Sequence, residues 1–366
     1  MQSYISALQE LKRSSFLVNG RSVTFAYIDS GPPSSHTLAY ATIFAIHGIC
    51  FNSYTFTRLS PVLQNAGVRL VALNRRGYRG SSAYTDAELA PLSGQDTTDK
   101  ARFLEDRGLE YAHFIEGFVA KEDLPAFTPG QASINQGGVG LLGWSMGCTF
   151  SAACVAAAVK CSGTLQRLRA NLRAHIMIEP PSVSFGLPYP PNSYTPFIDE
   201  KIPMYARLPM TTRWLTAYFN HGDLDTRDLN VLEFVVPTTD RIPSLWNMDD
   251  VVQEKGIEEE PVFSVDAPIF RLSEELNAMY KEALFGSVMR SAFPGLKTSL
   301  LVGTKAISMS IASWWSIEQD DVANGGGLVQ YRVLDGLNHF VRLTTILYAH
   351  LGLLFTLHVL DAMGRP

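Results

Sequence analysis

Gly143-Trp144-Ser145-Met146-Gly147 is the stretch that decides the fold, because it combines a nucleophile with the backbone turn that would expose it. In a G-x-S-x-G pattern the serine occupies a cramped turn from a strand into a helix, where a side chain at either glycine would collide with neighbouring backbone. The flanks agree with this pattern. Residues 138–142 are a short apolar run typical of a buried strand, and residues 148–160 are rich in Ala and Val, which favours a helix packed closely on a sheet.

Two further segments end an apolar run with a polar loop. Residues 41–46 have the composition of a buried strand and end in His47-Gly48-Ile49-Cys50, and residues 329–334 lead into a loop that contains His339. With the serine turn between them, the chain resembles the α/β-hydrolase superfamily, which has an HG loop, a nucleophile turn and a late histidine in this order. The resemblance spans most of the chain and implies an α/β-hydrolase fold: a mostly parallel central sheet with helices on both faces.

The loop at residues 74–82, Asn-Arg-Arg-Gly-Tyr-Arg-Gly-Ser-Ser, carries the same resemblance. It is similar to the D-x-R-G-x-G-x-S loop of the family, in the variant that occurs in many little-studied fungal members. Asn74 replaces the usual aspartate, a position that does not perform the chemistry in that family. We interpret the arginines of this loop as hydrogen-bonded structural residues beside the active site, with binding of an anionic substrate group as the alternative.

Strands and helices alternate along the chain with one long interruption. The hairpin 16–18/23–28 around Asn19-Gly20 is followed by strand 41–46, helix 55–66, strand 69–73, helix 97–120, the strand and helix around Ser145, and strand 174–178. Six prolines between 180 and 196 then end the regular pattern, short amphipathic segments follow, and alternation resumes at residue 298. We therefore predict a core domain of residues 1–181 and 295–366 and an inserted, mainly helical cap domain of residues 182–294.

A serine hydroxyl needs a base, because it is a poor nucleophile unless an imidazole removes its proton during attack. Of the eight histidines, His339 alone follows a predicted final strand, in a loop placed to reach the carboxyl edge of the sheet. His47 is the competitor, and its counterpart in the family shapes the HG loop, which implies a structural role. The resemblance also implies two backbone N–H donors for an oxyanion, from Met146 and from Ile49, with Cys50 as the alternative to Ile49.

The acid of a Ser-His-acid triad departs from the usual pattern of the family. An aspartate usually follows the strand before the histidine, as in G-x-x-D, but Ala306 stands at that position here. A minority of members carry the acid after the strand that follows the nucleophile helix, and in this chain that residue is Glu179. We therefore predict Glu179 as the acid. Asp320, Asp321, a dyad without an acid, an engineered residue at 306 and a protein that no longer catalyses remain alternatives.

These residues predict a serine hydrolase that cleaves an ester, thioester or lactone of a largely apolar, medium-sized substrate through an acyl-enzyme. The serine argues against the epoxide hydrolase and haloalkane dehalogenase branches, which carry an aspartate at the nucleophile position. As substrate-binding residues we predict Trp144, Cys50, Tyr189, Trp214 and Trp246, although the aromatic residues of the cap would serve equally well as its own core. An acyltransferase with the same acyl-enzyme and a non-catalytic ligand-binding protein are the alternatives.

Composition narrows the setting of this enzyme. The 366 residues are 46% hydrophobic and 18% charged, with a net charge of -5 that provides no basic patch for nucleic acid. The four cysteines fit neither a metal site nor a disulfide framework, and residues 1–17 lack the apolar core of a signal peptide, so we expect a cytoplasmic protein without metal or cofactor. The apolar run 343–360 contains two histidines and predicts a closing helix rather than a membrane span, with a homodimer contact as a further expectation.

Overall fold

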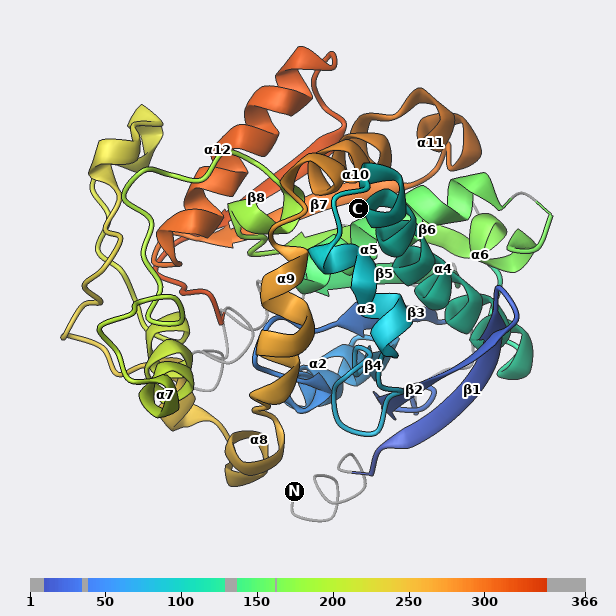
Figure 1. Cartoon of the computed structure of the whole chain (residues 1–366). Helices are drawn as coiled ribbons and strands as arrows, with labels where there is room; N and C mark the ends of the chain where they lie inside the picture. Colours follow the sequence, from blue (N-terminus) through green and yellow to red (C-terminus); the bar gives the residue numbers. More distant parts are fainter. Residues whose placement is uncertain (1–9, 35–38, 129–136, 162, 341–366) are drawn as a thin grey trace.

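An eight-stranded sheet forms the centre of the computed structural model, which describes residues 10–34, 39–128, 137–161 and 163–340 (Figure 1). The strand order is β1-β2-β4-β3-β5-β6-β7-β8. The strands are β1 (Lys12–Val18), β2 (Arg21–Asp29), β3 (Ala41–Ile46), β4 (Val68–Leu73), β5 (Val139–Trp144), β6 (Leu172–Ile178), β7 (Lys297–Gly303) and β8 (Val329–Leu334). β1, β2 and β4 pair antiparallel and all other neighbours pair parallel, which confirms the predicted fold class.

Helices connect most of the strands. The α-helices are α2 (Leu59–Asn65), α3 (Asp86–Ser93), α4 (Thr97–Lys121), α5 (Gly147–Lys160), α6 (Gln166–Asn171), α7 (Met204–Leu215), α8 (Asp250–Lys255), α9 (Ala267–Ile269), α10 (Ser273–Phe285), α11 (Ser287–Ala292) and α12 (Ser308–Ala323). Short helical turns are η1 (Ser53–Phe56), η3 (Ser182–Phe185), η4 (Leu224–Thr226), η5 (Leu229–Val231), η6 (Ser244–Asn247) and η7 (Val262–Asp266), of which η7 is a π-helical turn. The predicted strands and the long helix 97–120 all correspond to these elements.

Two apolar cores lie on opposite faces of the sheet because alternate side chains of a strand point to opposite sides. In β3, Phe44 and Ile46 belong to the core under α4, α5 and α10, whereas Ile43 and Ala45 belong to the core under α2 and η1. All six residues of β3 are buried, as expected for a parallel strand covered on both faces. The Ala-rich sequence of α5 brings this helix close to the sheet and to α4, and so brings its first turn to the end of β5.

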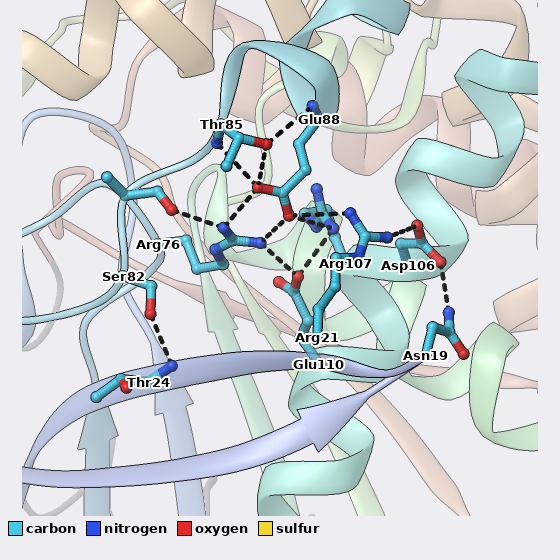
Figure 2. Close-up of polar contacts among 11 residues, drawn as sticks. Asn19, Arg21, Thr24, Arg76, Ser82, Thr85, Glu88, Asp106, Arg107 and Glu110 are labelled. Atoms are coloured by element: carbon cyan, nitrogen blue, oxygen red, sulfur yellow. Dashed lines mark hydrogen bonds and ion pairs between the residues drawn. The ribbon is translucent and has the colours of Figure 1, made fainter.

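The loop after β4 is anchored by buried charges that the arginine pattern had indicated. Arg76 donates to Glu88 of α3 at 2.6 and 3.0 Å and to Glu110 of α4 at 2.8 Å, and Arg107 pairs with the same Glu110 at 2.8 Å (Figure 2). Asn74 accepts from the Ser53 N–H and donates to the Arg79 carbonyl, and an ionised aspartate could not make the second bond. The interpretation of Arg76 and Asn74 as structural residues agrees with these contacts.

The segment between β6 and β7 has two kinds of surroundings. α7 and α8 lie away from α10 and α11 (Figure 1), whereas η3, α10 and α11 all contact α5. Leu276, Tyr280 and Leu284 of α10 belong to the same apolar core as α4 and α5. The division into core and cap at residues 182 and 294 stays a prediction.

Three expectations concern membrane spans, a dimer contact and the cysteines. Within the described ranges, no helix has the length and apolar character required to cross a membrane. The apolar run 343–360, with its expected dimer contact, lies outside the described residues. All four cysteines are free thiols, and Cys50, Cys148 and Cys154 are buried.

Candidate active site

Three polar side chains from separate strand ends meet at the carboxyl edge of the sheet. Ser145 directly follows β5, Glu179 directly follows β6, and His339 lies in the loop after β8. His339 Nε2 lies 3.0 Å from Ser145 Oγ, and His339 Nδ1 lies 3.4 Å from Glu179 Oε2. All three are at least 97% buried, so the chain Ser–His–Glu is shielded from bulk water. The imidazole can therefore take the serine proton on Nε2 while the carboxylate holds its Nδ1–H.

The backbone at this edge is strained in the way that an exposed nucleophile requires. Ser145 and Glu179 both have φ of 54°, and Cys50 has φ of 65°, so three of the six described non-glycine residues with positive φ lie here. A Cβ on Gly147 would lie 2.1 Å from the Ile46 carbonyl oxygen, and a Cβ on Gly143 would lie 2.6 Å from the Cα of Cys148. The glycines of the G-x-S-x-G turn are therefore required by contact with neighbouring backbone.

Glu179 is held in place by the strand where the family usually carries its acid. Its Oε1 accepts the N–H of Gly303 at 2.5 Å, and Gly303 is the last residue of β7. Burial raises the pKa of Glu179 well above its ordinary value, and the bonds from Gly303 and Ser310 oppose that shift only in part. Glu179 is therefore a carboxyl group whose ionisation depends on a positive charge beside it, and His339 is the group placed to supply that charge.

The alternative acids lie elsewhere in the fold. Asp320 accepts the Tyr280 hydroxyl at 3.0 Å, and Asp321 accepts the N–H groups of residues 327 and 328. Both lie toward the far end of α12, whose first residue Ser308 is near the site. Twelve residues of helix correspond to roughly 18 Å along its axis. Ala306 is fully buried, and its carbonyl oxygen lies 2.8 Å from the His221 imidazole.

His47 has both ring nitrogens occupied by backbone groups. Its Nε2 accepts the N–H of Arg75 at 2.9 Å, so its Nδ1 carries the proton and donates to the Gly48 carbonyl at 2.9 Å. This arrangement agrees with the structural role that the resemblance implied. Another Ser–His pair, Ser151 and His175, is 2.9 Å apart, but it is fully buried and burial lowers the pKa of His175 to about 4.

Two backbone N–H groups close to Ser145 in the chain or in the pocket have no hydrogen-bond acceptor among the described residues. Met146 immediately precedes the first residue of α5, and Ile49 lies in the loop after β3. Among the described residues neither N–H has a hydrogen-bond acceptor. The N–H of Cys50, the alternative donor, instead reaches the hydroxyl of Tyr78 at 3.2 Å. A Cβ on Gly48 would lie 2.8 Å from the Ser145 Cβ, so the loop and the serine are in direct contact.

An apolar pocket of about 310 Å³ opens at Ser145. Its lining includes Ile49, Ile307 and Met309 from the core and Phe197, Leu215, Phe270 and Tyr189 from the segment between β6 and β7. The pocket can hold a medium-sized apolar group against the serine.

The five residues predicted to bind substrate lie in different surroundings. Tyr189 lines the pocket and is 43% exposed, whereas the other four do not line it. Trp144 is buried and donates to the His339 carbonyl at 3.0 Å, and the Cys50 thiol is buried with a raised pKa because of burial and the charge of Asp266. Trp214 is buried and donates to the Val235 carbonyl, and Trp246 lies on the surface beneath the Arg213 guanidinium.

Sequence reasoning missed several residues that hold this site together. Ser310 donates to the Glu179 carbonyl at 3.2 Å and lies 3.4 Å from His339 Nδ1. Asn338 donates to the Thr216 carbonyl and to the Ser244 hydroxyl, which ties the histidine loop to the segment between β6 and β7. Neither residue has a neighbour in sequence that would have indicated its partner.

The family assignment follows from the fold, the serine turn and a direct comparison. Residues 43–341 match the model of the alpha/beta hydrolase family, and the chain belongs to that family. No curated protein matches the chain.

Solved structures with the same fold come from several branches of this family. A variant of a Vigna radiata epoxide hydrolase is 12% identical, with a TM-score of 0.52 over 98% of this chain and 100% of that chain. The thioesterase domain from the curacin biosynthetic pathway is 13% identical, with a TM-score of 0.47 over 94% of this chain and 99% of that chain. An esterase from Thermogutta terrifontis is 11% identical, with a TM-score of 0.49 over 96% and 99%. At 12% identity, the similarity to the epoxide hydrolase shows the fold alone.

Proposed function

We propose that this hydrolase-family protein is a serine hydrolase that cleaves an ester, thioester or lactone with an apolar acyl group through an acyl-enzyme. The observation that carries the proposal is the chain of contacts from Ser145 through His339 to Glu179 at the mouth of an apolar pocket. A serine alone would be a poor nucleophile, and an imidazole alone would lack a fixed tautomer. Here the three groups lie in the order that the chemistry needs.

In the proposed reaction Ser145 Oγ attacks the acyl carbonyl and passes its proton to His339 Nε2. The oxyanion accepts hydrogen bonds from the N–H groups of Met146 and Ile49, and the proposal is supported by the lack of another acceptor for either group among the described residues. His339 then gives the proton to the leaving group, and the acyl group stays on Ser145. Water, deprotonated by His339, attacks the acyl-enzyme; His339 returns that proton to Ser145 Oγ as the bond to the acyl group breaks, and the carboxylic acid leaves. Glu179 balances the imidazolium charge in both halves.

The test is covalent labelling with a fluorophosphonate, followed by peptide mapping and by turnover of p-nitrophenyl esters. We expect the adduct on Ser145, and we expect Ser145→Ala to lose both labelling and turnover while its melting temperature stays near that of the wild type. Ser151→Ala is the matched control, because it removes a buried hydroxyl that also contacts a histidine but has no access to the pocket. Turnover by Ser145→Ala near the wild-type rate would contradict the serine mechanism.

A further inference from the structure

A buried ion pair connects the segment between β6 and β7 to the loop that carries the Ile49 N–H. Asp266, the last residue of the π-helical turn η7, is fully buried and accepts from Arg75 Nη1 and Nη2 at 2.8 and 2.7 Å. It also accepts the Tyr78 hydroxyl at 2.6 Å. Arg75 and Tyr78 both belong to the loop after β4, so one carboxylate from the segment between β6 and β7 binds two residues of the core.

The same two residues hold the backbone on either side of Ile49. Arg75 Nη2 donates to the Gly48 carbonyl at 3.1 Å, and the hydroxyl of Tyr78 accepts the N–H of Cys50 at 3.2 Å. Cys50 has φ of 65°, so the loop has a strained backbone that needs fixed contacts to persist. The Gly48 carbonyl and the Ile49 N–H belong to one planar peptide group, so the bond from Arg75 holds the group that carries this N–H, and the bond to Tyr78 holds the next peptide group.

The charges of this cluster are fixed in one state. Burial disfavours a charged guanidinium, but the carboxylate of Asp266 more than compensates and raises the pKa of Arg75. Burial and the neighbouring Asp266 raise the pKa of Tyr78, so its phenol stays protonated and can donate to Asp266 while it accepts from Cys50. Removal of the Asp266 charge would leave Arg75 buried without a counter-ion, and the guanidinium would then move toward other acceptors.

We propose that Asp266 is a positioning residue of the oxyanion site, which orients the Ile49 N–H through Arg75 and Tyr78. This inference rests on the proposed serine mechanism. It follows that this one residue of the segment between β6 and β7 acts on the rate of the chemical step for every ester, independently of which acyl group the pocket accepts. Residues of the same segment that line the pocket act on the choice of substrate instead.

The test compares Asp266→Asn with Asp249→Asn. Asp249 forms another two-bond pair between this segment and the core, with Arg58 at 2.8 and 3.1 Å, and neither bond involves the loop of residues 48–50. For Asp266→Asn we expect kcat to fall by about 10- to 100-fold on acetyl and octanoyl esters alike, less than the loss of a whole donor, with KM nearly unchanged. The affinity for an alkylboronic acid, which mimics the tetrahedral intermediate, should fall by a similar factor. For Asp249→Asn we expect kcat and boronate affinity near wild-type values.

Tyr78→Phe separates positioning from folding, because it removes a single hydroxyl and keeps the Arg75–Asp266 pair. We expect Tyr78→Phe to lower kcat and boronate affinity, as Asp266→Asn does. If Asp266→Asn does not fold, Tyr78→Phe alone tests whether the cluster positions the Ile49 N–H. A folded Asp266→Asn or Tyr78→Phe with the kcat and boronate affinity of Asp249→Asn would contradict the inference. A wild-type protein that neither reacts with fluorophosphonate nor hydrolyses any ester would instead contradict the proposed function.

Discussion

At the scale of single residues, Glu179 is the acid that the sequence predicts, because Ala306 stands where an aspartate is usual. Glu179→Gln can keep the bond from the Gly303 N–H, because the amide oxygen can take the place of Oε1. Its amide nitrogen would then face His339 Nδ1 and favour the tautomer with the proton on Nε2, which cannot accept the serine proton. We expect kcat to fall on the order of a thousandfold, measured as steady-state turnover of a p-nitrophenyl ester.

The pH dependence of stability gives this variant a second signature. Burial raises the pKa of Glu179, so the folded protein binds this proton more tightly than the unfolded chain does. The neutral Glu179 carboxyl group therefore stabilises the folded protein at pH values below the ordinary pKa of glutamate. This stabilisation is lost as the pH rises through the raised pKa of Glu179. The side chain of Glu179→Gln does not titrate, so the variant does not lose this stabilisation. The free energy of unfolding of the variant minus that of the wild type should therefore increase from about pH 5 to about pH 8. A constant difference across that range, in urea titrations, would contradict the raised pKa.

Single residues were predictable from sequence only where the local chain imposes a geometry. The G-x-S-x-G turn and the loop with His339 each follow a strand, and strand ends of a parallel sheet meet at one edge, so their proximity could be anticipated. Glu179 was predicted from the resemblance, because a minority of the family carries the acid after the strand that follows the nucleophile helix. Asp266 was not, because its partner Arg75 lies 191 positions earlier and nothing in the local sequence indicates the pair.

At the scale of elements, α4 packs closely against the middle of the nucleophile helix α5. Gly108 of α4 faces α5 so closely that a Cβ would lie 2.1 Å from the Ala153 carbonyl oxygen, whereas Gly117 of the same helix is exposed with no atom within 4 Å of its Cβ position. Gly108→Ala should destabilise the protein by about 1–3 kcal/mol through overpacking. Gly117→Ala should stabilise it by about 0.5–1 kcal/mol through helix propensity.

Chemical unfolding of the two alanine variants checks this difference in sign. Gly117→Ala is the matched control, because both variants add the same methyl group to the same helix. Equal stability changes would show that α4 and α5 do not pack as closely as the structure has them.

Helices with a clear apolar pattern and strands with continuous apolar runs were predicted nearly to their ends. The predicted helix 97–120 corresponds to α4 (Thr97–Lys121), and the predicted strand 329–334 has the bounds of β8. The sequence analysis did not separate α10 from the short helices before it, because composition does not reveal which surface an amphipathic helix covers. Only its contacts with α4 and α5 show that it packs on the core.

At the scale of the whole molecule, the segment between β6 and β7 is both a wall of the pocket and part of the scaffold. Asp266 is connected to the loop of residues 48–50 through Arg75 and Tyr78, and Thr216 and Ser244 hold Asn338 beside the histidine. Deletion of this segment would therefore remove contacts from two loops of the site at once. Its pocket-lining side chains, such as Phe197 and Leu215, do not take part in these contacts, so we expect that substrate choice can change while the chemistry is kept.

Leu215→Ala tests that separation. Leu215 is buried in α7 and lines the pocket. Its truncation enlarges the space for a long acyl chain, and it removes apolar contact from the short acyl chains that the wild-type pocket already accepts. We expect the ratio of kcat/KM for decanoyl over butanoyl esters to rise about tenfold, while kcat on acetyl esters stays within about twofold of the wild type. Leu245→Ala is the control, because Leu245 is buried in the same segment but does not line the pocket, and it should lower stability without changing the ratio. If both variants lowered activity toward every ester by one common factor, the segment would act as scaffold alone and the acyl group would have to bind elsewhere.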